Sequence, residues 1–231
     1  MGHPTVIYPL PDLPPSGGPG EVITVNTATP DYPQPPTVHT VAFVDGQNLF
    51  HCAKTAFGHT YPNYDPKRLA EAICAARGWK LTQVRFYTGV PPKDRDPHWH
   101  EFWAKKGTSM SRKGVHVVTR PLRYSEELLS DGTFAYVARE KGIDVRIAID
   151  IISLADKKNF DAALIFSQDQ DLAELVPEIR TIATRQQRWI KLASAYPAGG
   201  GSNNSRGINN TDWIPIDQAL YERCLDPNRY N

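Results

Sequence analysis

Apolar and polar positions change their pattern near residue 40. From there onward, short apolar runs alternate with stretches in which apolar residues recur every three or four positions. Residues 40–44 and 162–166 are apolar almost throughout, which is typical of strands buried on both faces of a parallel sheet. Further strands are predicted at residues 84–88, 115–119 and 189–193, and helices at residues 65–77, 143–155, 171–183 and 217–224. The alternation predicts an α/β domain with a central, mainly parallel sheet that helices cover on both faces.

The first 38 residues differ in composition from the rest of the chain. They contain half of the 20 prolines, which excludes a regular helix or a central strand. We predict an extended, proline-rich arm over residues 1–38 and one folded domain over residues 39–231. A proline-rich ligand for another protein is the less favoured interpretation of the arm. Contacts of the arm with a second copy of the chain or with a partner protein stay open.

Overall composition limits the classes of partner. The chain has 26 Lys plus Arg and 25 Asp plus Glu, so its formal charge of +1 gives no general attraction to polyanions, and any nucleic-acid site must be local. Cys52, Cys74 and Cys224 lack the C-x-x-C spacing of zinc or redox motifs. No apolar run approaches the roughly 20 residues of a membrane span, and the N-terminus lacks the layout of a signal peptide. We expect a cytoplasmic protein with no membrane partner.

Two of the predicted buried strands run directly into acidic clusters. Residues 45–48 read Asp-Gly-Gln-Asn, and residues 167–171 read Ser-Gln-Asp-Gln-Asp. A third acid, Asp144, begins the helix predicted at residues 143–155, and Asp150 lies further along it. In open α/β sheets, ligands bind outside the carboxyl ends of the strands, so both clusters are expected at the binding edge.

Gathered carboxylates repel one another unless a cation neutralises them. Oxygen ligands from Asp and Asn suit a hard ion such as Mg²⁺ or Mn²⁺ better than zinc. Each acid taken alone is more simply explained as a turn or helix-cap residue, for example Asp45, Asp144 or Asp171. Two such clusters in one chain favour a metal site.

Three segments together carry a family resemblance. They are residues 44–50 (Val-Asp-Gly-Gln-Asn-Leu-Phe), residues 141–144 (Lys-Gly-Ile-Asp) together with Asp150, and residues 167–172 (Ser-Gln-Asp-Gln-Asp-Leu). From about residue 40 to residue 224 the chain resembles the NYN domain of the PIN-like nuclease superfamily, particularly its LabA-like bacterial branch. A lone D-G-x-N would be weak, but the three motifs together are fairly specific.

The resemblance implies a Rossmann-like, three-layer domain that acts on RNA, or less often on DNA, through a divalent metal. At one position the chain departs from the family pattern, because Gln168 stands where Gly is usual. The residues that match the family's metal-binding acids are Asp45, Asp144, Asp169 and Asp171, with Asn48 as the accompanying asparagine and with Asp150 and Ser167 as secondary candidates.

The favoured hypothesis is a metal-dependent nuclease that hydrolyses phosphodiester bonds, with single-stranded RNA as the favoured substrate. In it, Asp45, Asp144 and Asp169 bind the principal Mg²⁺ or Mn²⁺, Asp171 supports that ion or a second one, and Asn48 orients substrate or water. One alternative is a non-catalytic RNA-binding or regulatory module in which the change at residue 168 has removed turnover. An aspartyl-nucleophile phosphatase is disfavoured, because that chemistry wants a second acid at position 47, which is Gln.

Cationic and aromatic residues interleave between residues 93 and 123. Trp99, Phe102 and Trp103 lie among lysines and arginines there, and stacking combined with phosphate contacts is a common way to bind single strands. A solvated surface helix whose aromatic residues pack on the core explains the pattern equally well. The candidate nucleic-acid-binding residues are Lys105, Lys106, Arg112, Lys113 and Arg123, together with Arg206 in the Gly/Ser/Asn-rich loop at residues 199–210.

Overall fold

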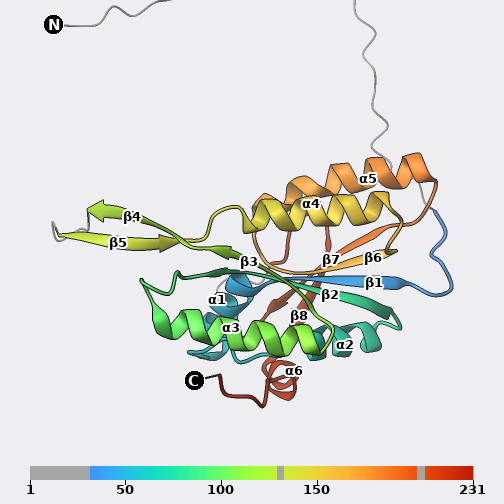
Figure 1. Cartoon of the computed structure of the whole chain (residues 1–231). Coiled ribbons are helices and arrows are strands. Elements are labelled where there is room, and N and C mark those ends of the chain that lie inside the picture. The colour runs from blue at the N-terminus through green and yellow to red at the C-terminus, as the bar shows by residue number, and fades with distance from the viewer. Residues whose placement is uncertain (1–31, 129–132, 202–205, 231) are drawn as a thin grey trace, which may run out of the picture.

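A six-stranded parallel sheet forms the middle layer of the computed structural model, which describes residues 32–128, 133–201 and 206–230. The strand order is β3-β2-β1-β6-β7-β8 (Figure 1). The strands are β1 (His39–Asp45), β2 (Lys80–Val90), β3 (His116–Pro121), β6 (Ala162–Phe166), β7 (Lys191–Pro197) and β8 (Asp212–Ile216). This arrangement confirms the predicted mainly parallel α/β sheet.

Helices cover both faces of the sheet and complete the three layers. One face carries α1 (Gly46–Phe57), α2 (Pro66–Ala76), α3 (Pro97–Arg112) and α6 (Gln218–Arg223); the other carries α4 (Ile143–Asp156), the 3₁₀ helix η1 (Gln170–Glu174) and α5 (Leu175–Gln186) (Figure 1). The proline-bounded stretch from residue 91 is therefore largely the helix α3, and Phe102 and Trp103 pack on the core as the alternative interpretation held. Helix α1 was not predicted.

Strand β1 lies at the centre and alternates between two apolar cores. Val41 and Phe43 belong to the core under α4 and α5, whereas Ala42 and Val44 belong to the core under α1, α2 and α3. All four residues are essentially inaccessible to solvent. Burial on both faces explains why this strand reads as a continuous apolar run.

Chain order reverses between β1 and β6. The strands that follow β1 along the chain, β2 and β3, lie on one side of it, and β6, β7 and β8 lie on the other. Val44 pairs with Phe166 in the β1–β6 ladder, so the residues that follow these two emerge side by side. A crevice at such a reversal is where open α/β sheets bind ligands.

A two-stranded antiparallel hairpin, β4 (Arg123–Leu128) and β5 (Phe134–Arg139), projects away from the sheet (Figure 1). Its outer part exposes large apolar side chains, with Leu128, Phe134 and Tyr136 each more than half accessible. The hairpin and the edge strand β8 were not predicted.

Most of the predicted arm, residues 1–31, lies outside the described residues, so the extended arm and the domain boundary at residues 38/39 stay predictions. In the described part of the predicted arm, residues 32–38, the Tyr32 hydroxyl donates a hydrogen bond to the Thr184 carbonyl on α5 (3.4 Å), and Val38 is buried. Within the described parts of the chain, no helix combines the length and apolar character needed to cross a membrane.

Candidate active site

Asp45 ends β1 and begins α1. Its side-chain Oδ1 accepts a hydrogen bond from the backbone N–H of Asn48 (3.0 Å), so it is the N-cap of the helix. The next residue must be small, because a Cβ on Gly46 would lie 2.5 Å from the Phe86 ring and 2.9 Å from the Tyr87 carbonyl oxygen. This close approach of α1 to β2 leaves Asp45 only 6% exposed. The cap interpretation is thus correct for Asp45.

The loop after β6 is held by its own side chains. The Ser167 hydroxyl oxygen accepts a hydrogen bond from the backbone N–H of Asp169 (3.1 Å), and Asp169 Oδ1 accepts one from the backbone N–H of Asp171 (3.0 Å). Asp169, rather than Asp171, is therefore the N-cap, and it caps η1. Asp171 lies exposed in the first turn of η1.

Asn48 joins the two strand ends. Its side-chain Oδ1 accepts a hydrogen bond from the backbone N–H of Gln168 (3.0 Å), while its own backbone N–H donates to Asp45. The amide oxygen that was considered as a metal ligand is thus already engaged in fixing the loop after β6 against α1. Asn48 therefore links the start of α1, which Asp45 caps, to the loop after β6 that carries Asp169.

Gln168 adopts an ordinary backbone conformation. Among the described non-glycine residues, only Lys158, Gln187 and Asn210 have positive φ, so the loop after β6 does not require glycine at position 168. The Gln168 side chain is buried, and its Nε2 donates to the Arg206 carbonyl oxygen (2.6 Å). Gln168, which stands where the family usually has Gly, therefore connects the loop after β6 to the loop that carries Arg206.

The carboxylates at this edge influence one another. Burial raises the pKa of Asp45 to about 6 against the backbone hydrogen bond from Asn48, and the negative charges of Asp169 and Asp144 raise it further. Asp144 occupies the first turn of α4, directly after Gly142. The three acids predicted to hold the principal metal are therefore electrostatically coupled across the ends of β1, β6 and the start of α4.

Glu140 is a fourth carboxylate that the sequence analysis missed. Burial raises its pKa to about 7, with further contributions from the charges of Asp45 and Asp144, and its Oε2 accepts the backbone N–H of Gly89 (2.5 Å). A Cβ on Gly89 would lie 2.6 Å from that oxygen, so glycine is needed for this contact. The only sequence signal was its position immediately before the Lys141-Gly142-Ile143-Asp144 motif.

The family model of the NYN domain matches residues 39–190, which contain all four of these carboxylates. The chain belongs to the NYN domain family. NYN domains are part of the PIN-like nuclease superfamily.

Two solved structures that resemble this chain are distant from it in sequence. A protein of unknown function from Vibrio parahaemolyticus is 17% identical with a TM-score of 0.47, and the match covers 80% of this chain and 97% of that chain. MurG from Acinetobacter baumannii is 7% identical with a TM-score of 0.31, covering 78% of this chain and 45% of that chain. A search of curated proteins found no match.

Asp150 has a structural environment in this NYN domain. It is 6% exposed and lies between the guanidinium groups of Arg85 (2.8 Å) and Arg146 (2.8 Å), and it also accepts the Tyr87 hydroxyl (2.8 Å). Burial alone would raise the pKa of Asp150, but these hydrogen bonds and positive charges lower it overall. Its charge is already neutralised, so the structure does not support the secondary metal-binding role predicted for it.

The remaining acids fit a hard cation in chemistry but are not preformed around one. Over residues 32–128, 133–201 and 206–230, no three Asp, Glu, His or Cys side chains converge closely enough to hold an ion. The buried Asp45 and the partly buried Glu140, whose pKa values are raised, nevertheless offer the carboxylate oxygens that Mg²⁺ or Mn²⁺ prefers, and a bound cation would relieve their repulsion. PIN-like nuclease domains usually use divalent metals.

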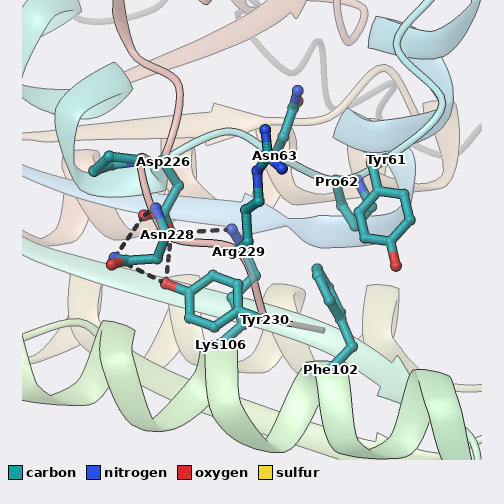
Figure 2. A pocket seen from close by; sticks show the side chains of 10 residues that line it. Tyr61, Pro62, Asn63, Phe102, Lys106, Asp226, Asn228, Arg229 and Tyr230 are labelled. Carbon is teal, nitrogen blue, oxygen red and sulfur yellow. Dashed lines mark hydrogen bonds and ion pairs between the residues drawn. The ribbon is translucent and has the colours of Figure 1, made fainter.

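Lys106 was wrongly predicted to contact nucleic acid. Its side chain is fully buried; Nζ donates to the Tyr64 carbonyl oxygen (3.0 Å) and forms an ion pair with Asp226 (3.3 Å). Figure 2 shows it beneath Tyr230 and beside Asp226, in the wall of the cavity between α3 and the C-terminal tail. Lys106 lies on the inward face of α3, where its ion pair with Asp226 holds the C-terminal tail.

The other candidate cations lie at different places on the NYN domain. Lys113 pairs with Asp65 (2.9 Å) at the end of α3, and Arg112 adjoins it. Both residues come just before β3, so they lie at the amino ends of the strands and away from the carboxyl ends. Lys105 is exposed on α3, and Arg123 begins the hairpin. We call the edge of the sheet that carries Asp45 and Asp169 the acidic edge. Arg206 is the candidate cation that lies at this edge, where its carbonyl oxygen accepts a hydrogen bond from Gln168.

Proposed function

We propose that this NYN domain is a divalent-metal-dependent nuclease that hydrolyses phosphodiester bonds, with single-stranded RNA favoured over DNA. The observation that carries the proposal is the buried Asp45 at the reversal of strand order, whose raised pKa reflects burial and the charges of Asp169 and Asp144. Strongly perturbed carboxylates in a crevice are typical of functional sites. Three reduced cysteines agree with the proposed cytoplasmic location.

Each residue at the edge has a distinct role in the proposal. Asp45, Asp144 and Asp169 would hold Mg²⁺ or Mn²⁺, with Asp171 supporting them from its exposed position. When bound, such an ion polarises a phosphoryl oxygen and lowers the pKa of a water molecule. Asn48 and Ser167 hold the loop after β6 in place, so they are positioning residues.

Glu140 adds a proton-binding group beside the acids. With a pKa of about 7, it holds a proton for part of the time at neutral pH, which limits the negative charge next to Asp45 and Asp144. Arg120 on β3 lies close to the start of α4. Its guanidinium Nη1 is 2.9 Å from the position that a Cβ on Gly142 would take. Arg120 and Arg206 therefore provide cations that could orient a phosphate strand at this edge.

The decisive experiment is cleavage of labelled single-stranded RNA by the full chain with Mn²⁺. We expect Asp45→Asn and Asp169→Asn each to reduce the rate by at least about 100-fold, since even residues that only support metal ligands commonly contribute 10- to 100-fold. Asp156→Asn is the matched control, because Asp156 lies at the opposite end of α4 from Asp144 and is exposed. Cleavage by Asp169→Asn at the wild-type rate, or cleavage by the wild type in EDTA, would contradict the proposed site.

A non-catalytic RNA-binding module is the second candidate function. It is favoured by the finding that the described carboxylates do not converge to a preformed metal site. A wild-type protein that binds single-stranded RNA but cleaves neither RNA nor DNA with any divalent ion would select this alternative.

A further inference from the structure

A cavity of about 300 Å³ opens next to the acidic edge, between the first turn of α1, the N-terminal half of α3 and the base of the hairpin. We call it the aromatic pocket, because rings from all three elements line it. The residues that matter here are Gln47, Phe50, Trp99, Trp103, Tyr124 and Ala138.

We propose that the aromatic pocket binds one nucleobase of a single strand whose phosphate backbone passes the acidic edge. This inference rests on the proposed nuclease function and names the feature of the substrate that the site recognises. Gln47 lines the pocket and lies two residues after Asp45, in the first turn of the same helix. A strand held at Asp45 therefore has a neighbouring base within reach of the pocket.

The walls of the pocket suit a flat aromatic ligand. Trp99 packs against Tyr61 (5.0 Å between ring centroids) and Phe102 (5.1 Å), and Trp103 packs against Phe86 (5.9 Å). These contacts hold both indole rings in place before any ligand arrives. Trp103 is buried in the core, so the partly exposed Trp99 is the ring on which a base would stack. Rigid aromatic platforms bind unpaired bases by stacking, with about 1–3 kcal/mol for each base.

The polar groups of the pocket favour a base over a phosphate. Asp96 contributes a carboxylate to the wall, where its Oδ1 caps α3 through the backbone N–H of Trp99 (3.1 Å). A carboxylate repels a phosphate but accepts hydrogen bonds from the amino and imino groups of a base, and the Gln47 amide can donate or accept. Arg95 lies over the ring of Tyr124 (5.7 Å), which lines the pocket, and over the ring of Tyr136 (5.2 Å) on the hairpin. The base therefore fits inside, and the backbone phosphate fits beside Arg95.

The test uses the full chain in EDTA, so that binding is measured without cleavage. Trp99 and Trp103 line the pocket, so a single-stranded RNA of about 12 nucleotides should quench tryptophan fluorescence, whereas an abasic strand of equal length should not. Ala138→Phe places a ring in the pocket from β5. It should weaken RNA binding, measured by fluorescence anisotropy, by about tenfold, in line with the loss of one stacked base. Ala104→Phe, on the exposed surface of α3, is the matched control and should bind as the wild type does.

Each outcome decides the inference separately from the nuclease proposal. Base-dependent quenching that Ala138→Phe removes supports the pocket even if the wild type cleaves nothing. Wild-type affinity and quenching in Ala138→Phe overturn the pocket even if metal-dependent cleavage is present, as does a wild type that binds no single strand. If a synthetic peptide of residues 2–31 quenches the tryptophans and RNA does not, the pocket belongs to the proline-rich segment, and the inference is wrong.

Discussion

Replacing Asp45 by Asn should stabilise the metal-free protein. Asn is as good an N-cap as Asp, so the hydrogen bond from the Asn48 backbone can persist, while the buried negative charge is removed. The pKa of Asp45 rises from an ordinary value of 3.8 to about 6, and each unit corresponds to about 1.4 kcal/mol. The carboxylate thus lowers the free energy of unfolding by up to about 3 kcal/mol at alkaline pH.

The pH dependence of this effect has a definite sign. Because the folded state binds the Asp45 proton more tightly than the unfolded state, the wild type loses stability as pH rises from about 4 to about 6, and the loss stays constant above that range. The variant lacks this titration. The stability difference should therefore be about 3 kcal/mol near pH 8 and fall below about 1 kcal/mol near pH 4.

Urea unfolding in EDTA at several pH values measures this difference. Asp171→Asn is the matched control, because Asp171 lies exposed at the same edge, and its substitution should change stability by no more than about 0.5 kcal/mol. A variant at Asp45 that is no more stable than the wild type near pH 8, or whose advantage does not shrink on acidification, would refute the reasoning.

Divalent metal should offset most of the stability difference between the wild type and the variant that lacks the Asp45 charge. Ion at about 100 times its dissociation constant stabilises a protein by about 2.7 kcal/mol, and this gain should be confined to chains that keep both Asp45 and Asp169. Thermal unfolding of the wild type and of an Asp45→Asn/Asp169→Asn variant, each with and without Mn²⁺, measures it. Equal shifts in the two proteins would show that the ion binds elsewhere.

Three further substitutions test the supporting structure. Lys106→Met should destabilise the fold by about 3 kcal/mol in urea unfolding, since the buried carboxylate of Asp226 keeps only the more distant Lys113 (3.7 Å) as a cation. No loss of stability would mean that the ion pair with Lys106 does not hold the tail. Asp150→Asn should lower the unfolding free energy by a few kcal/mol at neutral pH, because Arg85 loses its counter-charge. The partners of Asp150 lower its pKa, so this loss of stability should shrink as pH falls below about 4. The pH dependence is thus opposite in sign to that of the Asp45 substitution. Gly46→Ala should destabilise the fold by about 1–3 kcal/mol and slow RNA cleavage, because its methyl group would meet β2; wild-type cleavage with unchanged unfolding would contradict the close contact.

The sequence alone was sufficient for the main elements that carry the site. Apolar runs at residues 40–44 and 162–166 are recognisable because both faces of these strands are buried, and burial on both faces leaves no alternation to confuse the pattern. The acids that follow these runs lie at the carboxyl edge because every strand of the sheet is parallel.

Elements with little burial, or with an unusual composition, were missed. The hairpin exposes Leu128, Phe134 and Tyr136, so its strands lack a core-facing pattern, although the Asp131-Gly132 dipeptide in its sequence is typical of hairpin turns. Strand β8 contains Pro215, which a parallel sheet accepts at its edge. Patterns of apolar residues in the sequence predict buried elements better than exposed ones, because packing against a core is what requires apolar residues at regular positions.

What the sequence determined by itself is the presence and the order of the acids, since these follow from strand periodicity and from the direction of the chain. Only the tertiary structure decided which of them influence one another's charge. Glu140 joins Asp45 and Asp144, Asp150 is neutralised by two arginines, and Lys106 turns inward to Asp226. The charge state of a carboxylate or an amine depends on burial and on neighbours far apart in the chain, and no local pattern of residues contains that information.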